Sequence, residues 1–156
     1  IMNLFYYKRK ITKKKRDIKL AVELAFLYLI VCVMGLGDLI AFCGHAFAPN
    51  VVASKIGWPI GSPFQFEVAL ADLSFGVLGI LCIWFRGNFW FAAAIANAIF
   101  LLGCAYGHIR DIMLKSNFAP YNAGPVLYIG DILMPLLILT LYFMHVQMSK
   151  TSKKRK

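Results

Sequence analysis

Four long apolar stretches, separated by shorter polar segments, restrict this chain to very few folds. Of its 156 residues 60% are hydrophobic, and the mean hydropathy is +0.69. Soluble domains are nearer to about 45–50% apolar. A stretch of about 20 apolar residues is long enough to cross the ~30 Å hydrocarbon core of a bilayer as an α-helix. The sequence therefore predicts an all-α membrane protein, a bundle of four transmembrane helices.

Turn residues and helix start signals set the expected boundaries of this bundle. Ser62, Pro63 and Gln65 are typical of a helix start, with serine as the N-cap, proline at the first helical position and glutamine closing a capping box. The expected spans are residues 20–44, 63–85, 89–108 and 125–146, which make residues 20–146 one transmembrane bundle. Residues 1–19 form a basic N-terminal arm, and residues 147–156 form a basic tail.

The distribution of basic residues predicts the topology. Of seventeen Lys and Arg residues, eight lie between Lys8 and Lys19 and five between Lys150 and Lys156. By the positive-inside rule both termini face the cytoplasm. Because the formal charge of +10 gathers in two flanks around an apolar middle, it does not predict a nucleic-acid partner. The expected partners are the lipid bilayer and its anionic headgroups.

Two stripes of residues run side by side along the third expected helix. The polar stripe consists of Asn97, Cys104, His108 and Asp111, and the stripe of small residues consists of Ala92, Ala96, Gly103 and Gly107. Small residues at this spacing let a neighbouring backbone come close in membrane proteins. We therefore expect the small stripe to pack against another helix of the bundle. The apolar outer surfaces of the first and last spans remain available for a homo-oligomer.

Ionisable residues of all four spans fall at one level of the predicted bundle. With both termini inside, this level lies in the outer half of the membrane or at its outer edge. A charge that faces lipid costs several kcal/mol, so these side chains should face inward and pair with one another. The layer consists of Asp38, His45, Glu67, Asp72, His108, Arg110, Asp111 and Asp131, beside which lies Asn97 of the polar stripe.

Three interpretations of this layer stay open. The first is a structural ion-pair network of Glu67, Arg110 and Asp131 that joins the helix ends. The second is a divalent metal site for Zn²⁺, Mn²⁺ or non-haem iron, with haem between the two histidines as a weaker variant. The third is a site for a proton, an ion or a small molecule. The candidate metal ligands are His45, Glu67, His108, Asp111 and Asp131.

These interpretations favour a protein that binds a metal ion, a proton or a small ligand over an enzyme. The alternative is a membrane enzyme that acts at the outer leaflet with Glu67 or Asp131 as general base. A second alternative is a structural or accessory subunit. The four cysteines lie singly in apolar stretches without a C-x-x-C pair, which argues against disulfide exchange.

Three motifs also carry a family resemblance. They are GWPIGSPFQFEVALADLSFGVLGIL at 57–81, FLLGCAYGHIRD at 100–111 and NAGPVLYIGDILMP at 122–135. They resemble the motifs of a family of small prokaryotic four-span membrane proteins of unknown function, over about residues 20–145. The resemblance implies a multi-pass protein of the prokaryotic cytoplasmic (inner) membrane, and it implies no particular chemistry. It adds Asn122 to the candidate site and points again to His45, Glu67, Asp72, His108, Asp111 and Asp131.

Overall fold

The computed structural model describes residues 2–153, which form helices and short connections without any β-strand. The helices are α1 (Met2–Tyr28), η1 (Leu29–Leu36), α2 (Gly37–Phe47), α3 (Pro49–Ile56), α4 (Phe64–Leu81), α5 (Asn88–Lys115), η2 (Val126–Leu133) and α6 (Met134–Lys153). Four helical segments are long and apolar enough to cross a membrane: Arg16–Phe47, Phe64–Leu81, Asn88–Lys115 and Val126–Thr151. The prediction of an all-α chain with four candidate transmembrane helices is therefore confirmed.

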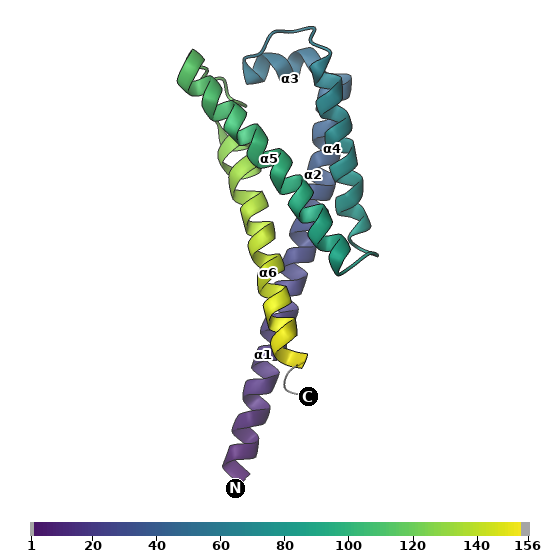
Figure 1. Ribbon diagram of the computed structural model, residues 1–156, viewed down its shortest axis with the longest axis vertical. Helices are drawn as coiled ribbons and strands as arrows, with labels where there is room; N and C mark the ends of the chain where they lie inside the picture. The colour runs from purple at the N-terminus through teal and green to yellow at the C-terminus, as the bar shows by residue number, and fades with distance from the viewer. Residues whose placement is uncertain (1, 154–156) are drawn as a thin grey trace.

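The helices form two pairs that lean together (Figure 1). The first span is one rod, because α1, the π-helix η1 and α2 follow one another without a break. Helix α4 packs along η1 and α2, whereas α5 packs along η2 and α6. Helix α6 also lies against α1, so the N-terminal and C-terminal ends of the described chain lie at the same end of the bundle.

The connection between the first two spans contains a helix that the sequence did not predict. Helix α3 begins at Pro49 and ends at Gly57, whose φ of +80° is the left-handed conformation that favours glycine at a helix end. It lies across the end of the bundle opposite the termini (Figure 1). The predicted capping box is wrong: Ser62 Oγ accepts a hydrogen bond from the Phe64 amide at 3.3 Å, but Gln65 bonds His45 instead of closing a box.

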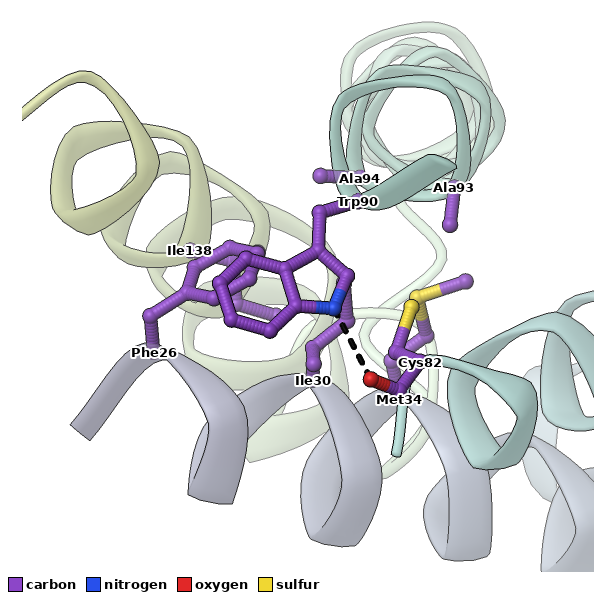
Figure 2. Close-up of a cluster of buried hydrophobic side chains, with 8 residues drawn as sticks. All are labelled: Phe26, Ile30, Met34, Cys82, Trp90, Ala93, Ala94 and Ile138. Atoms are coloured by element: carbon purple, nitrogen blue, oxygen red, sulfur yellow. Dashed lines mark hydrogen bonds between the residues drawn. The ribbon is translucent and has the colours of Figure 1, made fainter. Parts of the chain in front are cut away.

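A compact apolar core fills the end of the bundle that carries the termini (Figure 2). The indole of Trp90 lies 4.9 Å from the ring of Phe26 between centroids, and its Nε1 donates a hydrogen bond of 2.8 Å to the carbonyl oxygen of Cys82. This bond ties the start of α5 to the end of α4. The cluster consists of Phe26, Ile30, Met34, Cys82, Trp90, Ala93, Ala94 and Ile138. This core therefore joins all four spans at one end.

The close helix contact involves other small residues than the predicted stripe. A Cβ on Gly79 of α4 would lie 2.6 Å from Cα of Gly35 in η1, so only glycine allows these two backbones to meet. By contrast, a Cβ on Gly103 or Gly107 of α5 would meet no atom within 4 Å. The expectation that the small stripe packs against a neighbouring helix was wrong at these two glycines, because they face open space.

This difference predicts opposite results for two Gly→Ala substitutions. We expect Gly79→Ala to destabilise the protein by about 1–3 kcal/mol, the usual cost of forcing an extra methyl group into a tight contact. Gly103→Ala should not lower the stability, since alanine has the higher helix propensity and finds free space here. Denaturant titration of both variants in one detergent checks this. Equal losses in both would contradict the assignment of Gly103 to open space.

Candidate functional site

A cavity of about 920 Å³ lies between the two helix pairs, on the α3 side of the apolar core. Six of the ten predicted site residues line it: Asp38, His45, Asp72, Asn97, His108 and Asp131. Most other lining residues are apolar, among them Val33, Val68 and Phe100. Four glycines, Gly37, Gly103, Gly107 and Gly130, also line the cavity, and a Cβ on any of them would meet no atom within 4 Å. The volume is open partly because these positions have no side chain.

The cavity opens sideways, between α2 and α5. Ile40 on α2 and Ile99 on α5 both line it, and they are 73% and 68% exposed. On helices that cross a membrane such side chains face lipid. The end next to α3 is covered, because Val52, Trp58 and Tyr121 of the connecting segments also line the cavity. The geometry therefore leaves the cavity open at the side of the bundle, between α2 and α5.

Carboxyl groups are the acidic groups of this cavity. Asp72 on α4 and Asp131 on η2 are only 5% and 6% exposed, and Oδ2 of each is buried without a hydrogen-bond partner. Asp38 on α2 accepts a hydrogen bond of 2.8 Å from Asn97 Nδ2. No lysine or arginine of the described chain lines the cavity. The cavity thus offers acidic acceptors without an internal lysine or arginine to neutralise them.

His108 is held in one orientation by Asn122. Asn122 is fully buried, and its Nδ2 donates to the carbonyl oxygens of Asn117 at 2.8 Å and of His108 itself at 3.4 Å. Its Oδ1 is therefore left to accept a hydrogen bond from His108 Nδ1, at 2.7 Å. The other ring nitrogen, Nε2, faces Asp131, with 3.7 Å between Nε2 and Oδ2. Asn122 does not line the cavity but positions a residue that does.

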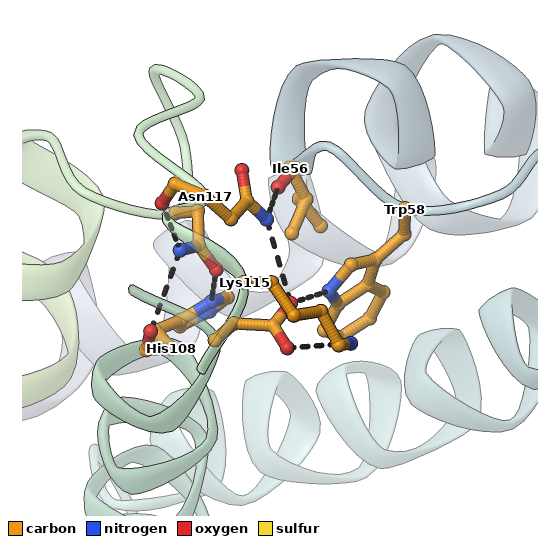
Figure 3. Close-up of polar contacts among 7 residues, drawn as sticks. Ile56, Trp58, His108, Lys115 and Asn117 are labelled. Atoms are coloured by element: carbon orange, nitrogen blue, oxygen red, sulfur yellow. Dashed lines mark hydrogen bonds and ion pairs between the residues drawn. The ribbon is translucent and has the colours of Figure 1, made fainter. Parts of the chain in front are cut away.

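A set of polar contacts closes the covered end of the cavity (Figure 3). Trp58 Nε1 donates to Asp111 Oδ2 at 3.1 Å, and its ring stacks on that of His108 with 6.0 Å between centroids. Asn117 Nδ2 donates to the carbonyl oxygen of Ile56 at 2.9 Å. Lys115 Nζ lies 2.7 Å from Asp111 Oδ1. These contacts, which we call the outer clamp, join the end of α3 to the end of α5. Asp111 has a structural role in this clamp and does not line the cavity.

The predicted ion-pair network of Glu67, Arg110 and Asp131 was wrong. Glu67 and Arg110 are both exposed, and neither forms an ion pair or a side-chain hydrogen bond within the described chain. Neither lines the cavity. Both residues lie near helix ends, where a long side chain can turn outward toward the membrane surface. Asp131 instead lies beside His108.

The five predicted metal ligands do not come together. Within residues 2–153 no three His, Cys, Asp or Glu side chains are grouped so that they could hold a metal ion. His45 Nδ1 pairs with Gln65 Oε1 at 2.7 Å, Asp111 belongs to the outer clamp, and Glu67 is exposed. Of the five predicted ligands, only His108 and Asp131 form a close pair.

Sequence reasoning missed three residues that shape this region. Gln65 is buried at 2% exposure and bonds His45, although its position at the start of a helix suggested a cap. Trp58 and Asn117 lie in connections whose folding depends on contacts distant in sequence. The one signal that the sequence offered is that a buried tryptophan needs a polar partner for its indole N–H.

The orientation of His108 leads to a prediction about Asn122. Replacement by leucine, which is similar in size, leaves the buried Nδ1–H of His108 without an acceptor, so Asn122→Leu should cost about 1–3 kcal/mol of stability. It should also move the ¹⁵N resonance of His108 Nδ1 in selectively labelled protein. Asn50→Leu is the control, because Asn50 is exposed and bonds only the Gly61 amide. An unchanged His108 resonance in Asn122→Leu would contradict the described hydrogen bond.

Comparison with known proteins finds a family of unknown function, as the resemblance of the motifs predicted. Neither a curated protein nor a solved structure shows a significant match to this chain. A family model described as a family of unknown function, DUF6790, matches residues 2–151. Since this match covers nearly the whole chain, the protein belongs to the DUF6790 family.

Proposed function

We propose that this protein is a multi-pass membrane protein that binds a small organic ligand in the cavity between its two helix pairs. The observation that supports this most directly is the cavity itself, a volume of about 920 Å³ lined by apolar side chains and by a few buried polar groups. Small-molecule sites are commonly of about 300–1,000 Å³ and have this composition. An ion-pair network would instead have filled the space between the helices.

The sideways opening suggests how the ligand arrives. Because Ile40 and Ile99 flank the opening on helices that would face lipid, a ligand with an apolar body can enter from the bilayer. The carboxyl groups of Asp72 and Asp131, which have no hydrogen-bond partner within the described chain, would then bond a polar group of that ligand. The apolar body of the ligand would thereby contact the apolar side chains of the cavity, and its polar group would contact the acidic ones.

The charge distribution supports a membrane orientation for this proposal. Basic residues flank the bundle at the end where both ends of the described chain lie, so the positive-inside rule supports a cytoplasmic location for that end. The cavity then lies in the outer half of the membrane, and the basic flanks attract anionic headgroups. The family resemblance supports the cytoplasmic (inner) membrane of a prokaryote as the location.

Catalysis on the bound ligand is the second candidate function. The observation that favours it is His108, whose Nε2 faces both the cavity and the carboxyl group of Asp131 while Asn122 fixes its ring. An oriented imidazole beside a carboxyl group can transfer protons. Binding is the better-supported function, because no nucleophile is paired with this histidine among the described residues.

Filling the cavity tests the proposal. We expect a small molecule to be retained by the wild-type protein and lost from Gly130→Leu, because a leucine at this glycine occupies open volume without a clash at its Cβ. Native mass spectrometry of protein released from membrane vesicles detects the bound mass, and organic extraction identifies the compound.

The matched control for this experiment is Ala92→Leu, which adds the same side chain to an exposed position of α5 outside the cavity. It should retain the compound that the wild type retains. If wild type, Gly130→Leu and Ala92→Leu carry identical masses, or if the wild type carries no compound of its own, the cavity is not a ligand site.

A further inference from the structure

From the charges that face the cavity we infer the chemical class of the ligand: an organic cation, with a protonated amine at one end and an apolar body. This inference rests on the proposed function, because it requires that the cavity be a binding site.

The acceptors of the cavity determine the polar end of the ligand. Asp72 and Asp131 both line the cavity, and neither carboxyl group has a hydrogen-bond partner within the described chain. Carboxylate oxygens accept hydrogen bonds and attract positive charge. An ammonium group supplies both N–H donors and a charge, whereas an alcohol supplies a donor only and an anion supplies neither. The ammonium group is therefore the best match to these two carboxyl groups.

The side chains around the carboxyl groups of Asp72 and Asp131 do not supply a positive charge that could take the place of the ammonium group. Asp38 adds a third carboxyl group, and the two amide side chains nearby, Asn97 and Asn122, are uncharged. Among the side chains that the structure describes, His108 is the one basic group that faces Asp131, and at 3.7 Å it is too distant for a hydrogen bond. His45 also lines the cavity but is hydrogen-bonded to Gln65. Even a protonated His108 would neutralise one carboxylate and leave another without a partner.

The remaining surface determines the body of the ligand. Aliphatic and aromatic side chains make up most of the remaining lining, including Phe64 and Phe100. An amine small enough to be fully hydrated would leave this surface uncovered. A cation with an aromatic or aliphatic body covers it and partitions into the bilayer from which the cavity opens. Both a free amphiphilic amine and the headgroup of an aminophospholipid have this chemistry.

Three probes with the same body and different polar ends test the inference. They are 2-phenylethylamine, 2-phenylethanol and 3-phenylpropionate, which carry a positive, a neutral and a negative end. Cys104 lines the cavity and is half-buried, so its reaction with methyl methanethiosulfonate reports occupancy in a variant in which the other three cysteines are replaced by alanine. The protein is studied in nanodiscs of phosphatidylcholine and phosphatidylglycerol. The thermal unfolding midpoint with each probe is the second measurement, since a ligand that binds the folded state raises it.

We expect the amine to protect Cys104 at a concentration at least tenfold lower than the alcohol, and the carboxylate not to protect it. The double substitution Asp72→Asn with Asp131→Asn should remove the advantage of the amine and leave protection by the alcohol unchanged. Glu67→Gln is the matched control, because Glu67 lies on α4 like Asp72 but is exposed and outside the cavity. It should leave protection by the amine unchanged.

The outcomes separate this inference from the proposed function. Equal protection by the amine and the alcohol would contradict the inference that the ligand is a cation, and so would an advantage of the amine that survives the double substitution. In either case the proposal that the cavity binds a ligand would stand. No protection and no shift of the midpoint with any probe would overturn both. Nanodiscs that also contain phosphatidylethanolamine identify the source: a higher amine concentration for half-protection indicates that the lipid headgroup competes, and an unchanged one indicates a free amine.

Discussion

The two helix pairs of this protein are joined mainly at their ends, with the Asp38–Asn97 hydrogen bond between them, and the cavity depends on this arrangement. At one end Trp90 packs on Phe26 and bonds the carbonyl oxygen of Cys82. At the other end the outer clamp connects Trp58 to Asp111. Between these ends the helices need not close, because lipid chains are as apolar as the side chains that they would replace, so no hydrophobic force drives the walls together. A gap that would collapse in a water-soluble bundle can persist in a membrane.

Burial of several carboxyl groups in such a gap is expensive, and the structure offsets only part of that cost. Asn97 donates to Asp38, and His108 lies beside Asp131, but the free oxygens of Asp72 and Asp131 have no donor within the described chain. Native proteins leave few buried polar atoms unpaired, and those that remain need a physical explanation. A bound cation or proton would explain why both oxygens lack a donor from the described chain. A purely structural layer would instead use a basic residue such as Arg110, but Arg110 is exposed.

The sequence predicted the number of candidate spans and the inward-facing position of Asp72, His108 and Asp131, but not which side chains meet. Asp72, His108 and Asp131 could be found because an ionisable residue in the middle of an apolar helix has to face inward. Glu67 and Arg110 could not be separated from them, since a long side chain near a helix end can reach the membrane surface. The contacts of Trp58, Asn117 and Asn122 depend on how two connections fold against each other, and no local pattern encodes that. Likewise, small residues mark both a close contact, as at Gly79, and an open wall, as at Gly103.

The two π-helices explain why charge and space coincide. A π-turn inserts an extra residue into a helix, widens it and turns the following side chains to another face, and such turns are frequent at functional sites. Helix η1 ends directly before Gly37 and Asp38, and η2 contains Gly130 and Asp131. Pro135 follows η2 and lacks the N–H that an α-helix would direct to the carbonyl of Asp131. In both spans a widened turn thus presents a carboxyl group beside a glycine that leaves the adjacent volume empty. The room for a ligand atom therefore lies next to the charge that would bind it.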